Sequence, residues 1–366
     1  MASITKRPDG KYRARYRDAG GREHAKHFER KIDAQRWVRE QESSRDAGTW
    51  VDPRAGRRPL SEYVIAWQES QVHRATTAAQ VDSHLRNHVL PHFGDRAIAS
   101  IRPSEVQAWV KGRAEVLAPS TVEVVYRYLV AIFRAAVEDR VIAQSPCRGV
   151  KLPKAERRQV EPLAVEVVQA ITDAMPDKYR ALVTLAAGTG LRQGEAFGLT
   201  VDRVDFLRRT VKVDRQLVLL PGAGPEHAPP KTQASYRTVP LPAVVVDALA
   251  AHLAAYPAGE SGLIFTNDQG DPISRTRFSD QVWRPALKRA GLEGAKFHDL
   301  RHFYASLLIR HGESVKVVQS RLGHASAAET LDTYSHLWPD SEDRTRAAVD
   351  AVLGQSADQV RTETAT

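Results

Sequence analysis

The sequence predicts a mainly α-helical chain with small β elements, an α+β protein built from several domains. Its 366 residues exceed one ordinary domain and suit two or three, each large enough to bury its own core. Helical periodicity runs through residues 59–145 and most of 163–340, whereas strict alternation is confined to short stretches. Between the helical regions, residues 146–162 are basic, aperiodic and proline-bearing, which is typical of a linker.

The first expected element is a hairpin over residues 11–28, with Gly20 and Gly21 as its turn. Apolar side chains fall on one face and cations on the other: Tyr12, Ala14 and Tyr16 against Lys11, Arg13, Arg15 and Arg17. The cationic face is a candidate DNA contact. A solvated hairpin is the alternative, because strand faces exposed to water are often charged.

A helix is expected from residue 31 to a stop at Gly48, with Ile32, Trp37 and Val38 packed on the apolar face of the hairpin. Residues 1–58 carry 16 basic and 9 acidic side chains, so seven of the nine net positive charges lie there. The sequence therefore predicts a basic N-terminal module over residues 1–55. Such a module favours a polyanionic partner.

Residues 59–145 predict a domain of about four helices. Two helices show apolar stripes, formed by Leu60, Tyr63, Val64 and Trp67 and by Val81, Leu85 and Val89. Two more should begin at Ser104 and Ser120, because each is followed three residues later by a Gln or Glu that completes a capping box.

The region over residues 163–353 mixes helices with a few strands. Helices are expected over 162–171, 179–190, 191–199, 242–253, 297–312 and 315–324, and strands over 209–216 and 234–241. Near its end, an apolar stripe could dock on a neighbouring protomer or pack on its own domain; it consists of Ala348, Val349, Val352 and Leu353. The polar tail, residues 354–366, is expected to be disordered.

Composition also limits the compartment. The single cysteine, Cys147, allows no intrachain disulfide and fits a reducing environment. No stretch approaches the roughly 18 apolar residues of a membrane span, and the N-terminus lacks the apolar core of a signal peptide. We expect a cytoplasmic protein with no membrane partner.

The stretch HDLRH, residues 298–302, allows three interpretations. His298 and His302 could share a zinc ion, but the Glu that such a site needs beside its first His is absent, and Arg301 would place a cation beside the metal. Alternatively, His298 caps the helix and His302 lies in the core. In the third interpretation, His298 and Arg301 lie on one helical face and grip a phosphate.

The surrounding motifs favour the phosphate. In TGLRQGE, Arg192 and Glu195 are three apart at a helix start, so that the carboxylate can orient the guanidinium. The glycines there fit neither a dinucleotide loop nor a P-loop. Lys231 stands at the turn of a predicted hairpin, and His324 in LGH precedes Tyr334 in TYSH by ten residues.

This set closely resembles the catalytic signature of the tyrosine recombinases of the phage-integrase family: Arg192, Lys231, His298, Arg301, His324 and Tyr334. The resemblance covers residues 163–340 most fully and implies a catalytic domain over 163–353. Residues 59–145 resemble the family's helical core-site-binding domain, and residues 1–55 resemble the arm-site-binding module of its larger integrases.

The resemblance implies a site-specific recombinase that cuts and rejoins DNA through a covalent 3′-phosphotyrosine, with no metal or other cofactor, to integrate or excise phage or mobile-element DNA. In this chemistry the two arginines neutralise charge on the phosphate, Tyr334 attacks, and His298 is the base. Lys231 protonates the leaving oxygen and His324 bonds the phosphate. His302 is expected to be structural, and Tyr304 to lie in the core.

The expected partners are double-stranded DNA, at core and arm sites, and three further copies of the chain in a tetramer on DNA. A DNA-bending host factor and an excision-directing factor are further candidate partners. Two alternatives stay open. A type IB topoisomerase would relax supercoiled DNA that lacks a specific site, and a non-catalytic DNA-binding regulator would bind DNA without forming a covalent adduct.

Overall fold

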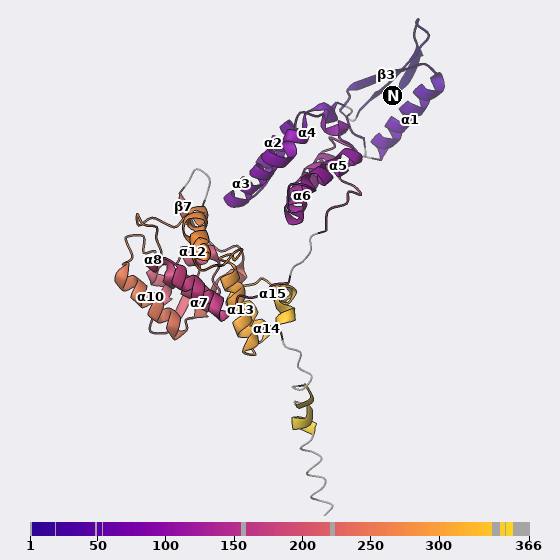
Figure 1. Ribbon diagram of the computed structural model, residues 1–366. Coiled ribbons are helices and arrows are strands. Elements are labelled where there is room, and N and C mark those ends of the chain that lie inside the picture. Colours follow the sequence, from indigo (N-terminus) through magenta and orange to yellow (C-terminus); the bar gives the residue numbers. More distant parts are fainter. Residues whose placement is uncertain are drawn as a thin grey trace, which may run out of the picture. The chain divides into compact units, whose positions relative to one another are not determined.

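A computed structural model describes residues 2–18, 20–47, 50–52, 54–154, 159–219, 224–338, 345–347 and 349–353 (Figure 1). The chain divides into two compact units, residues 1–156 and 157–366, and each is described by itself. None of the helices in these ranges combines the length and the apolar composition needed to cross a bilayer.

The first unit begins with a three-stranded antiparallel sheet, in the order β1–β2–β3, and one helix. These elements are β1 (Ser3–Lys6), β2 (Tyr12–Arg17), β3 (Glu23–Phe28) and α1 (Lys31–Asp46). The predicted hairpin is confirmed by the β2–β3 register, in which Tyr12 opposes Phe28 and Arg17 opposes Glu23. Strand β1, which was not expected, extends the sheet beside β2.

Helix α1 packs on the sheet through Ala34 and Val38, which are buried with Ala14 of β2. The expectation that Ile32 joins this face is wrong, because its side chain is 58% exposed. At about 100° per residue, Ile32 lies roughly opposite to Ala34 around the helix. The expected stop at Gly48 falls outside the described residues, and α1 ends at Asp46.

A helical domain follows in the same unit, as predicted. Its helices are α2 (Leu60–Ser70), α3 (Ala75–His84), α4 (Leu90–Phe93), α5 (Pro103–Ala114) and α6 (Pro119–Glu138), with a π-helical turn (Leu85–Val89) between α3 and α4. Both predicted stripes are buried in one core with a long face of α6, which includes Val122, Leu129, Ile132 and Phe133. The amphipathic periodicity was therefore sufficient to place this core.

The predicted starts of α5 and α6 are wrong by two residues. The N-caps are Arg102 and Ala118, and a proline occupies the first helical position after each. Proline suits that position, because its fixed φ is already helical and its missing N–H has no partner to lose there. At α5 the side chain of Glu105 bonds back to the backbone of the N-cap residue: the Arg102 N–H donates to Glu105 Oε2 at 2.9 Å.

No helix or strand interrupts the described residues between α6 and Val165. The start of this segment is nevertheless held by the helical domain. The Tyr126 hydroxyl donates to the Cys147 carbonyl at 2.7 Å, and Gln107 exchanges two hydrogen bonds with the backbone of Lys151. The predicted linker over 146–162 is thus anchored at its N-terminal end.

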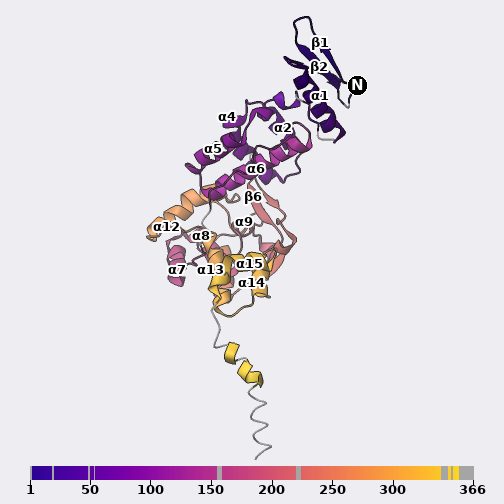
Figure 2. The same cartoon turned by 90° about the vertical axis from the view of Figure 1, so that its right-hand side faces the viewer.

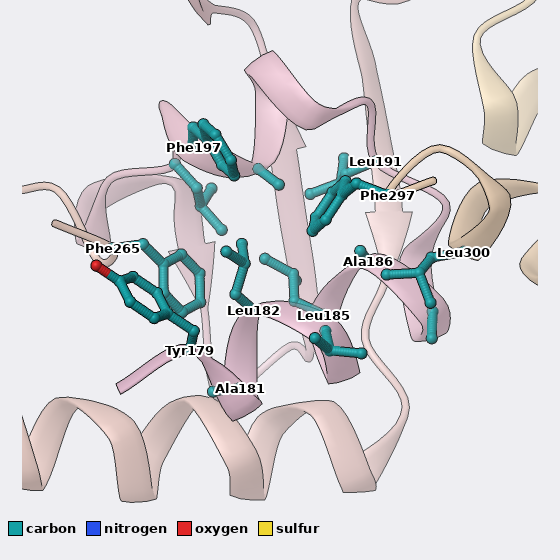
Figure 3. Packing of buried hydrophobic residues seen from close by; sticks show 14 of the residues in the cluster. Tyr179, Ala181, Leu182, Leu185, Ala186, Leu191, Phe197, Phe265, Phe297 and Leu300 are labelled. Atoms are coloured by element: carbon teal, nitrogen blue, oxygen red, sulfur yellow. The ribbon is translucent and has the colours of Figure 1, made fainter. Parts of the chain in front are cut away.

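The second unit surrounds α8 with helices. These are α7 (Val165–Ala174), α8 (Asp177–Thr189), α9 (Gln193–Phe197), α10 (Ala243–Ala255), α11 (Arg275–Phe278), α12 (Arg284–Arg289), α13 (Asp299–Arg310), α14 (Val315–Leu322) and α15 (Ala327–Tyr334). Leu182 and Leu185 of α8 lie among Phe197, Phe265 and Phe297 in the main apolar cluster (Figure 3). Helices α13, α14 and α15 lie side by side in both views (Figures 1 and 2).

Two small sheets complete this unit. One has the antiparallel order β4–β5–β8, and the other is a hairpin of β6 and β7; the strands are β4 (Val204–Asp205), β5 (Thr210–Val213), β6 (Gln216–Leu219), β7 (Pro225–Ala228) and β8 (Arg237–Pro240). The expected strands over 209–216 and 234–241 correspond to β5 and β8. The β6–β7 hairpin, which was not expected, lies between them in the chain.

The apolar stripe near the C-terminus is only partly described. Ala348 lies outside the described residues, while Val349, Val352 and Leu353 are exposed. These three side chains therefore do not pack on their own domain. The tail over 354–366 also lies outside the described residues.

Candidate active site

Arg192 and Glu195 form the first part of the site, at the start of α9. The predicted contact is present: Arg192 Nη1 lies 3.0 Å from Glu195 Oε1, and the Arg192 N–H donates to Glu195 Oε2 at 2.9 Å. A third bond runs from Arg192 Nη2 to the carbonyl of Gly323, at 3.0 Å. The carboxylate and a carbonyl 131 residues away thus fix the direction of the guanidinium.

A second arginine, Arg237 of β8, shares the same carboxylate and was missed from the sequence. Its Nη2 and Nη1 lie 2.7 and 3.1 Å from the two oxygens of Glu195, and its Nε donates to the Arg321 carbonyl at 2.8 Å. The sequence contained a signal for this residue. Side chains two residues apart in a strand point to the same face, and Val239 is buried, so Arg237 is a cation on the core-facing side of β8.

Glu195 is therefore a buried anion with two cationic partners. The side chains of Glu195 and Arg237 are only 3% and 5% exposed. Burial alone would raise the pKa of Glu195, but the hydrogen bonds and charge of Arg237, with those of Arg192, hold this pKa below its ordinary value. The carboxylate stays ionised at neutral pH.

Arg301, in the first turn of α13, has no such partner. Its two Nη atoms donate to the carbonyls of Gly190 and Leu322, each at 2.7 Å, and it makes no ion pair within the described ranges. The residue is 2% exposed. Burial, with the charges of Arg192 and Arg237, lowers the pKa of Arg301 to about 9, so it remains a cation at neutral pH.

Gly190 makes this contact possible. It ends α8 in the left-handed conformation, with φ of +65°, which turns its carbonyl out of the helix. A Cβ at this position would lie 2.5 Å from the ring of Tyr304. As expected, Tyr304 is buried in a core cluster, together with Leu322 and Tyr334. The glycine in TGLR thus holds Arg301, as well as ending a helix.

The charges of this cluster do not balance. Among the described residues, the two buried guanidiniums of Arg237 and Arg301 and the one-third exposed guanidinium of Arg192 stand against the single buried carboxylate of Glu195. An excess of two positive charges in a shielded site is costly unless an anion binds there.

Tyr334, the last residue of α15, lies beside this cluster. It is 1% exposed, and its hydroxyl lies 2.7 Å from Nδ1 of His302. Its ring stacks on that of His324, with centroids 6.3 Å apart and planes within 9°. Burial raises the pKa of the Tyr334 phenol to about 12, against a smaller opposing effect of Arg301. The phenol therefore needs a base to ionise.

The structure places His302, rather than His298, at this hydroxyl. His302 was expected to be structural and His298 to be the base, yet no hydrogen bond joins His298 to Tyr334 in the part of the chain described. His298 does occupy the N-cap position of α13, although its side chain caps no N–H. Its ring meets that of His302 edge-on, at 4.9 Å.

The histidines of the site are neutral at pH 7. Crowding by protein atoms lowers the pKa of His298 to about 4, and the neighbouring His302 and Arg301 add to this effect. Burial and nearby arginines lower the pKa of His324 to about 3. His324 Nδ1 bonds the hydroxyl of Thr330 at 2.9 Å, which sets the direction of its ring. Around Tyr334 in the described structure, the positive charge of the buried cluster therefore comes from its arginines and not from these histidines.

Lys231 is not at a hairpin turn, contrary to the prediction. It follows β7 on the way to a 3₁₀ turn (Gln233–Ser235), because the β6–β7 hairpin intervenes between the paired strands β5 and β8. Its side chain is exposed on this loop, unlike those of the buried arginines. The spacing from a strand was too weak a signal to place a loop lysine.

The cationic face of the N-terminal sheet is present but partly neutralised. Lys11 pairs with Glu29 at 2.7 Å, and Arg13 and Arg15 lie 3.6 and 3.8 Å from Glu23. Arg17 has no ion pair within the described part of the sheet.

Over all the described ranges of the chain, no group of three or more His, Cys, Asp or Glu side chains could hold a metal ion.

Two protein-family models match the chain. The phage integrase family matches residues 161–340, and the phage integrase central domain matches residues 59–152. The prophage phiRv2 integrase of Mycobacterium tuberculosis is 30% identical over 358 residues, which span 95% of this chain and 94% of that protein. The integrase of Mycobacterium phage L5 is 26% identical, over 82% of this chain and 83% of its own length.

Solved structures share the fold. The Tn1549 transposon integrase, in complex with a circular intermediate DNA, aligns with a TM-score of 0.69 at 20% identity, over 80% of this chain and 99% of its own. A lambda integrase dimer bound to a core site aligns with a TM-score of 0.60 at 19% identity. The alignment covers 93% of this chain and 97% of the lambda integrase chain. With the family models and the full-length prophage relative, these findings show that the chain belongs to the phage integrase family and is a site-specific tyrosine recombinase.

Proposed function

We propose that the buried cluster of the second unit cuts and rejoins DNA strands, with Tyr334 as the nucleophile and without a metal ion or nucleotide cofactor. The observation that carries this proposal is the unbalanced charge beside a buried phenol. Two surplus positive charges match the two negative charges of the pentavalent state, since the phosphodiester already carries one and gains another when the tyrosine oxygen adds to it.

The arginines fit the phosphate in geometry as well as in charge. Each guanidinium has five N–H groups, and Arg301 directs one bond to each of two carbonyls, so that donors remain for an anion. Arg192 is one-third exposed and can meet an incoming backbone from outside. Because Glu195, Gly323, Gly190 and Leu322 hold both groups, little reorganisation is needed when charge develops.

The proposed reaction exchanges one ester bond for another. The Tyr334 oxygen bonds to phosphorus, the bond to the 5′ oxygen breaks, and that oxygen takes a proton from Lys231. A 3′-phosphotyrosine keeps the energy of the broken bond, so the 5′ hydroxyl of another strand can reverse the step without ATP. We assign His324 a hydrogen bond to the phosphate, since its ring already stacks on Tyr334.

We further propose that the chain acts on double-stranded DNA as a homotetramer that integrates or excises phage or mobile-element DNA. A lambda integrase tetramer has been solved on a Holliday junction, and its chain shares this fold at a TM-score of 0.59. Residues 163–353 would form the catalytic domain and residues 59–145 the core-site-binding domain. A DNA-bending host factor and an excision-directing factor would complete the assembly.

Two surfaces outside the site have proposed roles. The face of β2 that carries Arg13, Arg15 and Arg17 would bind arm-site DNA, where phosphate oxygens would compete with Glu23 for two of these cations. The exposed Val349, Val352 and Leu353 would dock on a neighbouring protomer.

Covalent trapping tests the nucleophile. The substrate is a core-site duplex taken from the junction between the element and its host DNA, with a nick placed so that the short fragment bearing the new 5′ hydroxyl diffuses away. The parent should form an adduct that survives denaturant, is destroyed by protease and maps to the peptide containing Tyr334. Tyr334→Phe should bind the duplex about as well as the parent and form no adduct. An adduct mapped to Tyr304, or retained in the variant, would overturn the proposal.

A further inference from the structure

His302 makes the closest polar contact to the nucleophile. Its Nδ1 lies 2.7 Å from the Tyr334 hydroxyl, and the two rings meet at 65° with centroids 5.6 Å apart. His302 follows Arg301 directly in the first turn of α13, so a single helical turn carries both a phosphate-binding cation and the group at the attacking oxygen.

The direction of this hydrogen bond follows from burial. Tyr334 is protonated at neutral pH, and within the described residues its hydroxyl has no hydrogen-bond partner other than His302. A buried O–H that donates to nothing would cost about 1–3 kcal/mol. The hydroxyl therefore donates to Nδ1, which places the imidazole proton on Nε2 and leaves the Nδ1 lone pair facing the phenol.

We propose that His302, and not His298, accepts the proton of Tyr334 when its oxygen attacks the DNA phosphate. This inference rests on the proposed function of the site. His298 is one ring removed from the hydroxyl, because it contacts His302 edge-on and occupies the N-cap. A histidine that already holds the O–H needs no rearrangement to accept the proton.

The step balances in both directions. As the Tyr334 oxygen bonds to phosphorus, its proton moves to His302 Nδ1, and the electron pair of the breaking ester bond goes to the 5′ oxygen, which Lys231 protonates. When a 5′ hydroxyl attacks the phosphotyrosine, its proton returns to Lys231, and the electron pair of the breaking ester bond goes to the phenol oxygen of Tyr334. His302 then returns its proton to that oxygen. Burial lowers the pKa of His302, with Asp299 opposing and Arg301 reinforcing the shift, so the resting imidazole is neutral as this role requires.

The decisive experiment measures the single-turnover rate of adduct formation on the nicked core duplex, with DNA affinity measured separately. His302→Ala removes both the bond and the base. His302→Asn keeps an acceptor oxygen near the position of Nδ1 but is not basic, and so tests hydrogen bonding alone. His311→Ala is the matched control, because His311 is exposed at the other end of the same helix.

Adduct formation should fall about 10²–10⁴-fold in His302→Ala and nearly as far in His302→Asn, with DNA affinity little changed. Because His302 is only partly buried, added imidazole should enter the cavity of His302→Ala and restore the rate at least tenfold, and more basic imidazoles should restore more. The same additives should not change the rate of His302→Asn or His311→Ala.

Two outcomes would overturn the inference while the parent still forms the Tyr334 adduct. One is a parent-like rate in His302→Ala. The other is full recovery in His302→Asn with no response of His302→Ala to imidazole, which would reduce His302 to a positioning residue. A parent that forms no adduct at Tyr334 would contradict the proposed function itself.

Discussion

Arginine is used in two different ways in this molecule. On the N-terminal sheet, Arg13 and Arg15 are 45% and 43% exposed and share long contacts with Glu23. In the second unit, Arg237 and Arg301 have exposed fractions of 5% and 2% and are held by bonds of 2.7–3.1 Å. The first set can rearrange at little cost, whereas the second cannot move without leaving a buried group unpaired.

The difference indicates what each set can do. Exposed cations attract a polyanion over a distance and exchange their counterions for phosphates, so their effect depends on salt. Buried and fixed cations act in a low-dielectric environment, where charge that develops on a reacting group is stabilised most strongly. We therefore expect the N-terminal set to control affinity and the buried set to control rate.

Lys231 provides the strongest challenge to this division, since it is exposed and yet has a proposed chemical role. Lys231→Ala should slow cleavage of ordinary DNA about 10²–10⁴-fold, because the 5′ oxygen would leave without a proton. The same variant should cleave a substrate with sulfur at the bridging 5′ position at nearly the parent rate, since a thiolate is a good leaving group without a proton. An equal defect on both substrates would assign the acid to another residue.

Arg301→Ala tests the buried set directly. We expect adduct formation to fall about 10²–10³-fold on both the oxygen and the sulfur substrate, because the lost group stabilises charge on the phosphate and not on the leaving atom. Single-turnover trapping would measure this effect. Arg13→Ala on the same core duplex is the control and should retain the parent rate; recovery of Arg301→Ala on the sulfur substrate would contradict the assignment.

Arg237→Met should act mainly on stability. It leaves buried Glu195 with one cation instead of two, and the loss of a buried partner costs about 3 kcal/mol in the free energy of unfolding. Urea unfolding of the parent and the variant would measure it. Arg30→Ala breaks an exposed pair with Asp33 and should leave the midpoint unchanged. Equal midpoints for Arg237→Met and the parent would show that Arg192 alone suffices.

The smallest expected effect concerns the N-terminal sheet. Replacing Arg13, Arg15 and Arg17 together by Ala should leave core-site cleavage at the parent rate but weaken binding of arm-site DNA. A plot of the logarithm of the binding constant against the logarithm of the salt concentration loses roughly 0.9 of its slope for each phosphate contact removed. Loss of three contacts should therefore make this slope shallower by about 3. Binding titrations at several salt concentrations would measure it. An unchanged slope would favour the solvated hairpin.

The amino-acid sequence by itself determined the elements with a complete local pattern and one contact of the candidate site. Local periodicity placed the β2–β3 hairpin and the helical core around α6, because a strand or an amphipathic helix records its buried face at short range. The contact between Arg192 and Glu195 could likewise be predicted from a short motif. A spacing of three residues at a helix start brings the two side chains together independently of the tertiary structure.

Only the tertiary structure decided which distant groups meet. The second cation on Glu195 comes from a strand 42 residues away, and the carbonyl groups that hold Arg301 lie 111 and 21 residues from it. The bond between His302 and Tyr334 spans 32 residues. Helical spacing makes His298 and His302 equal candidates for the phenol, because both lie in one turn. The choice between them depends on how α15 packs against α13, and this packing is set by burial across the whole unit rather than by any local pattern.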